Sequence, residues 1–600
     1  MTPQILFVLA LVLVAAVVLV SDRLRPDLVA LLLLVILGLT GLVEAKDLFS
    51  GFSRSAVITI LGLFIITEGL ERTGATRILG QRLHRVSGEK EGRTVLVVMV
   101  ATATLSLVMN NIAAAAVLLP AVIGITRQTG LRPSRLLIPV SFGALLGGMA
   151  TLFTTANILV SAALVDQGLK PYGVLDFLPV GGPMALVGIL FMVFVGRRLL
   201  PEHELGGQET PRRTSGDLSE AYGMREAVCA CYVRPGSAMA GLSLAEGKWG
   251  ERLGLNILGI SRGGSVNLAP VPGEKVLEGD IILFTGFTDD EDLARYGLVS
   301  TQDPDWRGQL ASEQVSLVEA TLAPRSSLAG KTLREIQFRE RYDLSVLAIW
   351  REGNTLREAL GDLPLRFGDA FLIQGRRSQI NMLRSNPNFL ILEEEAGAAG
   401  AKVSRKAWLA VALTTAAVTL PALNVLPIAE SVFAAAALMI LFNCLSMDEA
   451  YGSVEWKTIF LIAGMIPLGL AMTNTGAAAF VGSGLIGLLG RWGPLVVAGG
   501  IYLATTLLTQ VLSGQVTPLV IAPIAIAAAQ HLGVDPRGMG MAVAMGCSTA
   551  FLTPISHSAN LLVMGPGGYK FKDYARVGLP LTLLMFVVLL AGLAAFWNIR

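Results

Sequence analysis

Charged residues are scarce in this chain: Asp, Glu, Lys and Arg make up 15% of its 600 residues, whereas an ordinary soluble domain has about 25%. The formal net charge of +2 is too small to indicate a nucleic-acid-binding protein. Four cysteines in a chain of this length exclude a disulfide framework. Cys229 and Cys231 stand two residues apart, and no His or Cys cluster completes a metal site around them. We therefore expect both to be small buried residues of a strand.

Several functional signatures are also missing. The sequence contains no nucleophile–base pair and no metal-binding cluster, so it predicts neither an enzyme nor a covalent cofactor. No Gly-x-Gly-x-x-Gly fingerprint follows a strand, which argues against a dinucleotide-binding half. A potassium filter would need a run of the Thr-Val-Gly-Tyr-Gly kind, and none is present.

Long hydrophobic runs dominate what is present, since 53% of the residues are hydrophobic. About 17–25 apolar residues can cross a bilayer as a helix. The candidate segments are 4–20, 27–43, 56–72, 95–126, 136–165, 178–200, 407–424, 428–445, 457–472, 495–530, 540–565 and 577–597. Two of them, 95–126 and 495–530, are long and polar in the middle, which fits re-entrant hairpins better than straight spans. Polar, Gly and Pro residues also interrupt 136–165 and 540–565.

Residues 201–403 have a different character, with frequent charges and short β-branched runs between Gly and Asp turns. They predict a soluble α/β or β-rich insert. If neither hairpin crosses, five crossings remain in each half, and the basic loops then lie on one side with the N-terminus outside. The insert is therefore expected in the cytoplasm. We predict a polytopic α-helical protein of the inner membrane with two inverted repeats, each of about five transmembrane helices plus a re-entrant hairpin, and a cytoplasmic α/β insert.

Short matches at a constant spacing support the two repeats. Pro120 and Pro523 end similar hairpin stretches, with 523 − 120 = 403, and Asn157 and Asn560 stand in similar stretches, with 560 − 157 = 403. Helices broken at corresponding places in two inverted halves indicate a transporter's central binding site. Helix N-termini suit an anion, and unwound carbonyls with Asn, Ser or Thr oxygens suit a small cation such as sodium.

The candidate binding residues are polar residues of the hairpin tips and helix breaks. They are Asn110, Asn111, Thr151, Thr154, Thr155 and Asn157 in the first half, and Ser513, Gly514, Gln515, Thr517, Thr553, Ser556, His557, Ser558 and Asn560 in the second. The candidate sodium ligands are Asn110, Asn111, Asn157, Ser513 and Asn560. The alternative is that such residues only bridge helices in the bundle. For His557 a proton relay, a substrate contact and plain helix packing all remain open.

The membrane part resembles the divalent-anion/sodium symporter family of the larger ion-transporter superfamily. Three stretches carry the resemblance, which covers nearly all of 1–200 and 405–600: Met109–Pro120, Gly147–Asn157 and Gly567–Pro580. It implies paired Ser-Asn-Thr tips that bind sodium and a carboxylate or sulfate substrate, an elevator-type movement of the domain that bears the hairpins, and a homodimer.

The two tips depart from the family pattern. The first reads Asn110-Asn111-Ile112 and the second Ser513-Gly514-Gln515, so both lack the Thr hydroxyl and the second also lacks the Asn. Substrate identity and the number of sodium sites are therefore the points that the resemblance leaves open.

The insert contains a second repeat. Gly279-Asp280 matches Gly368-Asp369 and Arg262 matches Arg351, each with a shift of 89. We expect the Gly-Asp pairs to form turns at the heads of strands. The stretches 217–303 and 307–394 resemble the C-terminal regulatory domains of potassium-uptake regulators (the TrkA-C type). That resemblance implies modules that dimerise and bind a nucleotide or another small ligand, and so regulation.

The sequence as a whole thus favours an elevator-type secondary transporter of a small divalent anion, such as sulfate or a di- or tricarboxylate. Sodium is the expected coupling ion, and the insert the expected regulator. Two other readings stay open: a ligand-gated ion channel or cation exchanger, and a nutrient sensor that has kept the transporter shell but lost transport.

Overall fold

The computed structural model describes most of the chain: residues 2–21, 23–76, 90–202, 222–224, 228–247, 249, 252, 255–263, 265–271, 273–285, 290–301, 315–323, 326–351, 354–384, 386, 388–392, 406–512 and 514–599. The expected module boundaries at 217, 303, 307 and 394 lie outside these residues.

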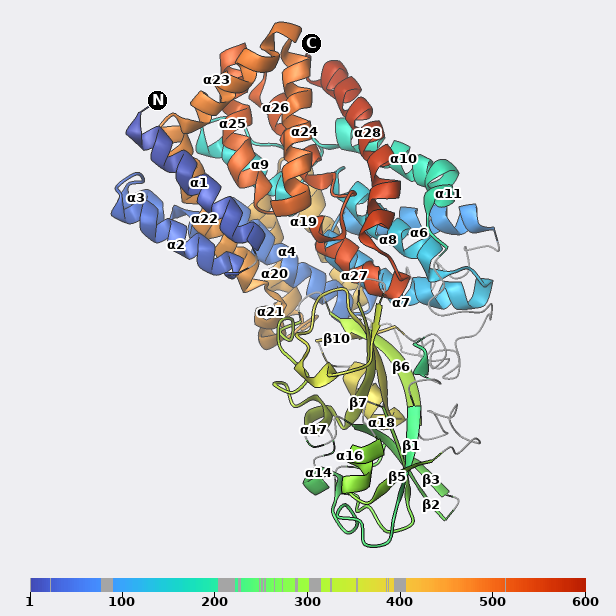
Figure 1. Cartoon of the computed structure of the whole chain (residues 1–600). Helices are drawn as coiled ribbons and strands as arrows, with labels where there is room; N and C mark the ends of the chain where they lie inside the picture. The colour runs from blue at the N-terminus through green and yellow to red at the C-terminus, as the bar shows by residue number, and fades with distance from the viewer. Residues whose placement is uncertain are drawn as a thin grey trace.

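Helices flank the insert on both sides in sequence. Before it come α1 (Pro3–Ser21), α2 (Pro26–Leu39), α3 (Ala45–Leu48), α4 (Ser55–Arg72), α6 (Glu91–Ser106), α7 (Asn111–Thr129), α8 (Pro133–Gly148), α9 (Thr155–Asp166), α10 (Leu178–Phe191) and α11 (Arg197–Leu199). After it come α19 (Ala407–Ala422), α20 (Ile428–Leu441), α21 (Met447–Ser453), α22 (Trp456–Asn474), α23 (Ala477–Leu489), α24 (Pro494–Leu512), α25 (Thr517–Leu532), α26 (Pro536–Ser548), α27 (Ser558–Gly567) and α28 (Phe571–Phe596). Together they form one helical body, below which the insert projects (Figure 1).

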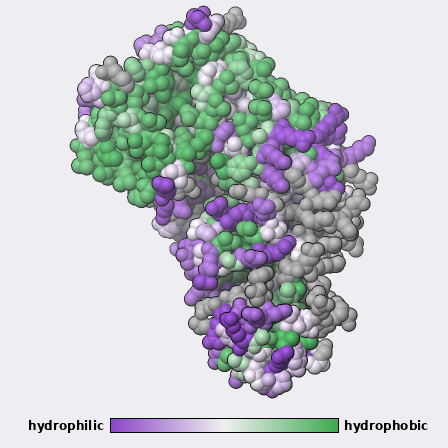
Figure 2. Space-filling view, viewed as in Figure 1, coloured by the Kyte–Doolittle hydropathy of each residue, from purple (hydrophilic) through white to green (hydrophobic). Residues whose placement is uncertain are grey.

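The helical body is built for a lipid environment. Among the described residues, 5 helices are long and apolar enough to cross a membrane, and several shorter apolar helices accompany them. Large side chains such as Leu39, Leu441 and Leu507 are exposed on the helical surface, and the space-filling view shows apolar residues over most of it (Figure 2). Exposing so large an apolar surface to water is unfavourable, whereas contact with the hydrocarbon tails of lipids is not.

Each of the four interrupted segments is a pair of helices with a break between them. The first hairpin turns between α6 and α7 over residues 107–110, and the second between α24 and α25. Residues 149–154 separate α8 from α9, and residues 549–557 separate α26 from α27. Polar breaks predicted from the sequence therefore lie inside the helical body, where their backbone groups need partners within the protein.

Short helices α3 and α21 and the longer apolar helix α23 lie outside the segments expected from the sequence. Helix α23 (Ala477–Leu489) follows α22 directly, but its segment carries Gly482, Gly484 and Gly487, and Gly lowers helix propensity in a helix interior. Packing overrides that preference, because Gly482 lies against the backbone of α25 at Ile524 and Ala528.

The helices form two packed groups. In the first, α1 and α2 pack on α22, and α20 packs on α4 and α19. In the second, α8 packs on α6, α7 and α27, while α26 packs on α24. Helices α9 and α25 lie between the groups, because α9 contacts both α4 and α26 and α25 contacts both α22 and α26.

The insert contains two five-stranded sheets of the same topology. The first comprises β1 (Val228–Val233), β2 (Asn256–Arg262), β3 (Ser265–Leu268), β4 (Ile281–Thr285) and β5 (Leu298–Thr301), with α14 (Leu244–Gly247) and α16 (Asp290–Arg295). The second comprises β6 (Val315–Leu322), β7 (Leu344–Arg351), β8 (Asn354–Leu356), β9 (Ala370–Arg376) and β10 (Phe389–Ile391), with α17 (Phe338–Tyr342) and α18 (Arg377–Arg384). The first sheet has the strand order β3-β2-β4-β1-β5. The second sheet, followed from its β8 edge, has the order β8-β7-β9-β6-β10, and each of its strands begins about 89 residues after its counterpart. The register shift in β2 between Ile257 and Gly259 recurs in β7 between Val346 and Ala348.

The two sheets pack on each other. Val228 and Leu283 of the first sheet share one buried apolar cluster with Leu317, Leu347 and Leu372 of the second. Each sheet also has an apolar cluster of its own on its other face. We call the unit around the first sheet module 1 and the unit around the second sheet module 2.

One expectation about the insert was wrong. Cys231 is buried in the core of module 1, but Cys229 is exposed. The register pairs Cys229 with Phe284, near one end of β1, and Cys231 with Ile282, further into the sheet. Two residues that share a face of a strand therefore differ in burial.

Candidate functional site

A cavity of about 130 Å³ lies where the hairpin tips, the helix breaks and α4 meet. The residues that line it are Ile60, Leu63, Phe64, Asn110, Asn111, Ile112, Leu145, Phe153, Thr154, Thr155, Ala156, Gly514, Gln515, Cys547, Ser548, Ser556, His557 and Ser558. The described residues of this lining include no Asp, Glu, Lys or Arg.

The N-terminal ends of helices converge on this cavity. Asn110 caps α7, with its side-chain oxygen accepting a 3.0 Å hydrogen bond from the backbone N–H of Ile112. His557 caps α27, where its Nδ1 accepts a 3.1 Å hydrogen bond from the N–H of Ala559. Thr154 is the N-cap of α9 but makes no side-chain cap bond, and Gly514 and Gln515 lie just before Val516, the N-cap of α25. Each such end carries unpaired N–H groups and the positive end of a helix dipole.

Asn157 holds the first helix break together. Its amide nitrogen donates to the carbonyls of Thr151 at 2.6 Å and Gly148 at 3.3 Å. Thr151 in turn donates to the carbonyl of Leu107 at 3.1 Å, which ties the break to the hairpin tip. Two buried oxygens, Asn157 Oδ1 and Thr154 Oγ1, have no hydrogen-bond partner among the described residues.

Asn560 holds the second break in a similar way. Its amide nitrogen donates to the carbonyls of Ala550 at 2.7 Å and Thr553 at 3.2 Å, and Ser556 donates to the same two carbonyls. Unlike Asn157 Oδ1, Asn560 Oδ1 has a partner, because the hydroxyl of Ser141 on α8 donates to it.

Gln510 ties the second break to its hairpin. Its amide nitrogen donates to the carbonyls of Thr506 and Thr549, each at 3.0 Å, and its oxygen accepts from the N–H of Leu552 at 3.2 Å. The hydroxyl of Thr553 donates back to the Gln510 carbonyl at 3.2 Å. This buried glutamine was missed in the sequence, although it stands one helical turn before the tip.

The two hairpin tips pack differently. Asn111 Oδ1 accepts a 2.6 Å hydrogen bond from Ser106, and it fits only because residue 148 is Gly: a Cβ there would lie 2.5 Å from Asn111 Oδ1. At the second tip Gly514 occupies the place of that Asn, and a Cβ on it would lie 3.1 Å from the Cys547 carbonyl. Close backbone packing thus accounts for the glycine in the second tip.

The predicted residues divide into two sets. Nine line the cavity: Asn110, Asn111, Thr154, Thr155, Gly514, Gln515, Ser556, His557 and Ser558. Asn157, Asn560, Thr151 and Thr553 instead hold the breaks in shape behind the lining. Thr517 is fully buried within the first turn of α25, and Ser513 lies outside the described residues.

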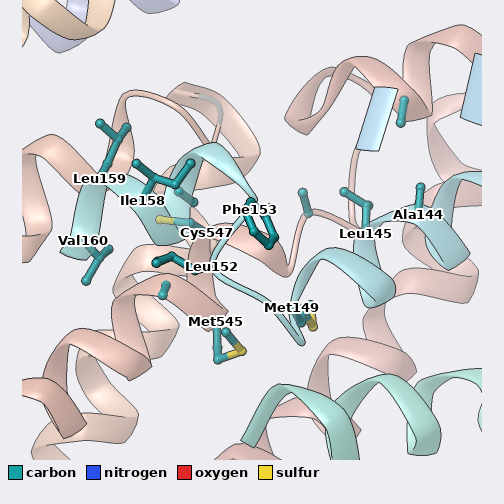
Figure 3. Packing of buried hydrophobic residues seen from close by; sticks show 14 of the residues in the cluster. Ala144, Leu145, Met149, Leu152, Phe153, Ile158, Leu159, Val160, Met545 and Cys547 are labelled. Atoms are coloured by element: carbon teal, nitrogen blue, oxygen red, sulfur yellow. The ribbon is translucent and has the colours of Figure 1, made fainter. Parts of the chain in front are cut away.

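The apolar part of the lining was not found in the sequence. Ile60, Leu63 and Phe64 form a wall contributed by α4 of the other helical group. Phe153 and Cys547, which also line the cavity, lie among buried apolar side chains of α8, α9 and α26 (Figure 3). Such residues look like any other apolar helix residue in the sequence, so only the spatial arrangement identifies them.

Broken helices that surround a polar cavity inside an apolar helical body define a multi-pass membrane transporter. The chain belongs to the citrate transporter family, whose pattern it matches over residues 16–546. It is 34% identical over 605 residues to the uncharacterized transporter YfbS of Escherichia coli, covering 98% of each chain. A Chlamydomonas reinhardtii protein provisionally named a sulfur deprivation response regulator is 28% identical over 565 residues, covering 90% of this chain and 93% of that protein. Sodium/sulfate cotransporter 2 of the same alga is 28% identical over 281 residues, covering 45% of this chain and 32% of that protein.

The family and the names of these relatives indicate a transporter rather than an enzyme. The chain is thus a transporter of the citrate transporter family.

Proposed function

We propose that the protein is a sodium-coupled symporter of a small divalent anion, with sulfate as the first candidate. The observation that carries the proposal is the convergence of helix N-termini on one cavity whose described lining has no carboxylate. Each helix end is equivalent to roughly half a positive charge. Several such ends attract an anion without a Lys or Arg and keep it exchangeable.

The size of the cavity favours a compact anion. Pockets for drug-sized ligands have volumes of roughly 300–1,000 Å³, whereas this cavity has about 130 Å³. A tetrahedral oxyanion presents acceptors in several directions and suits donors that converge from several helices. Sulfate is therefore preferred to a di- or tricarboxylate, and the name of the cotransporter relative supports this choice.

Sodium is proposed to bind beside the first break. Asn157 Oδ1 and Thr154 Oγ1 are buried and lack partners among the described residues, and an unpaired buried oxygen is costly unless a ligand satisfies it. Asn110 and Asn111 stand at the adjacent tip. The corresponding oxygen of Asn560 already accepts from Ser141, so the first half is the stronger candidate.

The inverted repeat and the elevator movement belong to the same proposal. Corresponding helices begin 403 residues apart: α6 and α24 at Glu91 and Pro494, α8 and α26 at Pro133 and Pro536. The two packed groups of helices supply a static and a moving part for residues 1–200 and 405–600. Both chain ends lie away from the insert (Figure 1), as expected if the insert is cytoplasmic and both ends are on the other side of the inner membrane. A homodimer is part of the same proposal.

Regulation by the insert is proposed on the basis of its two modules. Module 1, expected over 217–303, and module 2, expected over 307–394, share one sheet topology and resemble ligand-binding regulatory domains of the TrkA-C type. A nucleotide or another small ligand is the expected effector.

A nutrient sensor is the second candidate. Two observations favour it: the second tip has Gly514 where the divalent-anion/sodium symporters that the chain resembles have Asn, and one relative's name refers to the sulfur deprivation response. A sensor would bind the anion without moving it. No observation favours a cation exchanger, since the described cavity lining has no acidic residue.

The test is uptake of labelled sulfate by proteoliposomes that contain the purified protein, with an inward sodium gradient or an equal potassium gradient. We expect uptake that depends on sodium and is inhibited by excess unlabelled sulfate more strongly than by succinate or citrate. Empty liposomes are the control. Binding of sulfate by calorimetry without uptake would favour the sensor, and neither binding nor uptake of any anion would contradict both.

A further inference from the structure

The two modules of the insert contain the same Arg–Asp pair. In module 1, Arg262 makes two hydrogen bonds of 2.8 Å to Asp280, and in module 2 Arg351 makes two of 2.8 and 2.7 Å to Asp369. In each module the arginine also donates to a backbone carbonyl of the loop that leads to the aspartate. Both aspartates have only 1% of their side chains exposed. A bidentate pair of this kind fixes the orientation of the turn that carries the aspartate.

The glycine before each aspartate shapes this turn. Gly279 has φ +87° and Gly368 has φ +91°, a backbone conformation that other residues rarely adopt. The surroundings of the two turns differ. A Cβ on Gly279 would have nothing within 4 Å, whereas a Cβ on Gly368 would lie 3.1 Å from the carbonyl oxygen of Leu561 on α27.

Module 2 therefore touches a helix of the membrane part. From the other side, a Cβ on Gly565 of α27 would lie 2.2 Å from the Gly368 carbonyl, so the two backbones meet with no side chain between them. Leu392, just after β10, joins the apolar core of the helical body. Figure 1 shows β6 and β10 adjacent to α27, with β2 and β3 of module 1 at the far end of the insert.

Helix α27 leads from this contact to the cavity. It begins after His557, which lines the cavity, and it carries Asn560, which holds the second break. Leu561 stands four residues after His557, about 6 Å along the helix axis. A displacement of the turn at Gly368 has to move α27 or open a gap in a close-packed contact.

We propose that the contact between Gly368 and α27 is the coupling point through which the insert sets the anion site, with Arg351 and Asp369 as positioning residues. The inference rests on the proposed transport function and makes it more specific. The two events are thermodynamically linked. If a state of module 2 shifts the turn and thereby changes the affinity of the cavity for the anion, then anion binding changes the stability of that state of module 2 by the same free energy.

The chain offers a matched control for each change. Arg351→Ala and Arg262→Ala each remove a bidentate bond to an aspartate and a bond to a backbone carbonyl, the first near the contact and the second away from it. Gly368→Ala and Gly279→Ala strain equivalent turns, and only the first also presses on Leu561. Gly565→Ala is matched by Gly484→Ala in α23, where an added Cβ meets nothing within 4 Å.

The experiment measures KM and Vmax for labelled sulfate uptake in proteoliposomes, and hydrogen exchange of the α27 amides in the same full-length proteins. We expect Arg351→Ala, Gly368→Ala and Gly565→Ala to change KM by about threefold or more and to speed exchange in α27. The three controls should keep the wild-type KM and exchange. Arg351→Lys, which keeps the charge but not the bidentate geometry, should give an intermediate KM.

The outcomes separate the two proposals. If the wild type transports sulfate and each variant matches its control in both KM and α27 exchange, the coupling inference is wrong and the transport function stands. If the wild type carries no anion, the transport function fails. The exchange data alone then decide the coupling: faster exchange of α27 only in the three contact variants supports it, and no difference between the pairs overturns it.

Discussion

Asn157 and Asn560 hold their helix breaks in the same way, yet within the described part of the chain only Asn560 has a donor, Ser141, for its side-chain oxygen. Position 544 corresponds to Ser141 by the shift of 403, and it is Ala. Helix α26, which carries Ala544, packs on α9 as α8 packs on α27. The two halves are therefore alike in backbone support and unlike in the oxygen that each leaves for a ligand.

This difference gives the first prediction. Ala544→Ser would offer a hydroxyl to Asn157 Oδ1 and compete with sodium, so we expect the sodium concentration for half-maximal sulfate uptake to rise about tenfold. The matched change, Ser141→Ala, leaves Asn560 Oδ1 unpaired and should lower the free energy of unfolding by about 1 kcal/mol. Uptake as a function of sodium and thermal unfolding in detergent measure the two effects. An unchanged sodium dependence in Ala544→Ser would remove Asn157 from the sodium site.

The second prediction concerns Gln510, which joins the second hairpin to the second break. Gln510→Leu keeps the bulk but leaves the Thr549 carbonyl and the Leu552 N–H without this partner. We expect a loss of about 2 kcal/mol in unfolding free energy and a clear fall in sulfate affinity. Gln530→Leu, at an exposed position near the end of α25, is the control. Equal behaviour of the two variants would mean that Gln510 only fills space.

The third prediction uses the two cysteines of β1 to test the side of the membrane on which the insert lies. Cys229 is exposed, whereas burial, with a smaller contribution from Cys229, raises the pKa of the Cys231 thiol to about 12. Cys231 should therefore stay a protonated, unreactive thiol at pH 7–9. A membrane-impermeant maleimide should label inside-out vesicles and spare intact cells, and Cys229→Ser should abolish this labelling while Cys231→Ser should not. Labelling of intact cells would place the insert outside.

The fourth prediction tests the elevator movement. Arg54, just before α4, forms a 2.9 Å ion pair with Asp166 at the end of α9, and this pair ties the first helical group to α9, which lies between the groups. If α9 moves past α4 during transport, the pair must break. A partly exposed pair contributes about 1 kcal/mol or less, so its removal in Asp166→Asn should raise Vmax by about two- to fivefold. Asp27→Asn removes a pair within one group and should leave Vmax unchanged. The movement loses support if the two variants agree.

The positions of the breaks could be predicted because polar residues interrupt apolar runs at one constant spacing, and the backbone there must find partners within the protein. The roles of the individual residues could not. Asn157 and Asn560 were predicted as ligands, and that prediction stays open. The sequence did not indicate that their amide nitrogens also bond to nearby carbonyls, a local preference that Asn has wherever the backbone is open. Phe64 and its neighbours on α4 were missed because an apolar residue that faces a cavity has the same pattern as one that faces lipid. The exposure of Cys229 and the formation of the glycine-rich helix α23 depend on residues that are close in space but distant in the sequence, so the local sequence does not predict them.

The face-to-face pairing of the two sheets means that each chain carries two similar modules that pack on each other. Identical partners in a symmetric dimer must change together, because one gene encodes both. Two copies in tandem are free of that constraint and can specialise while the shared interface is kept. The two modules differ at one turn: Gly368 lies against α27, whereas a Cβ on its counterpart Gly279 would have nothing within 4 Å. Module 2 is therefore constrained at this turn by its contact with the membrane part, and module 1 is free of that constraint at the equivalent turn.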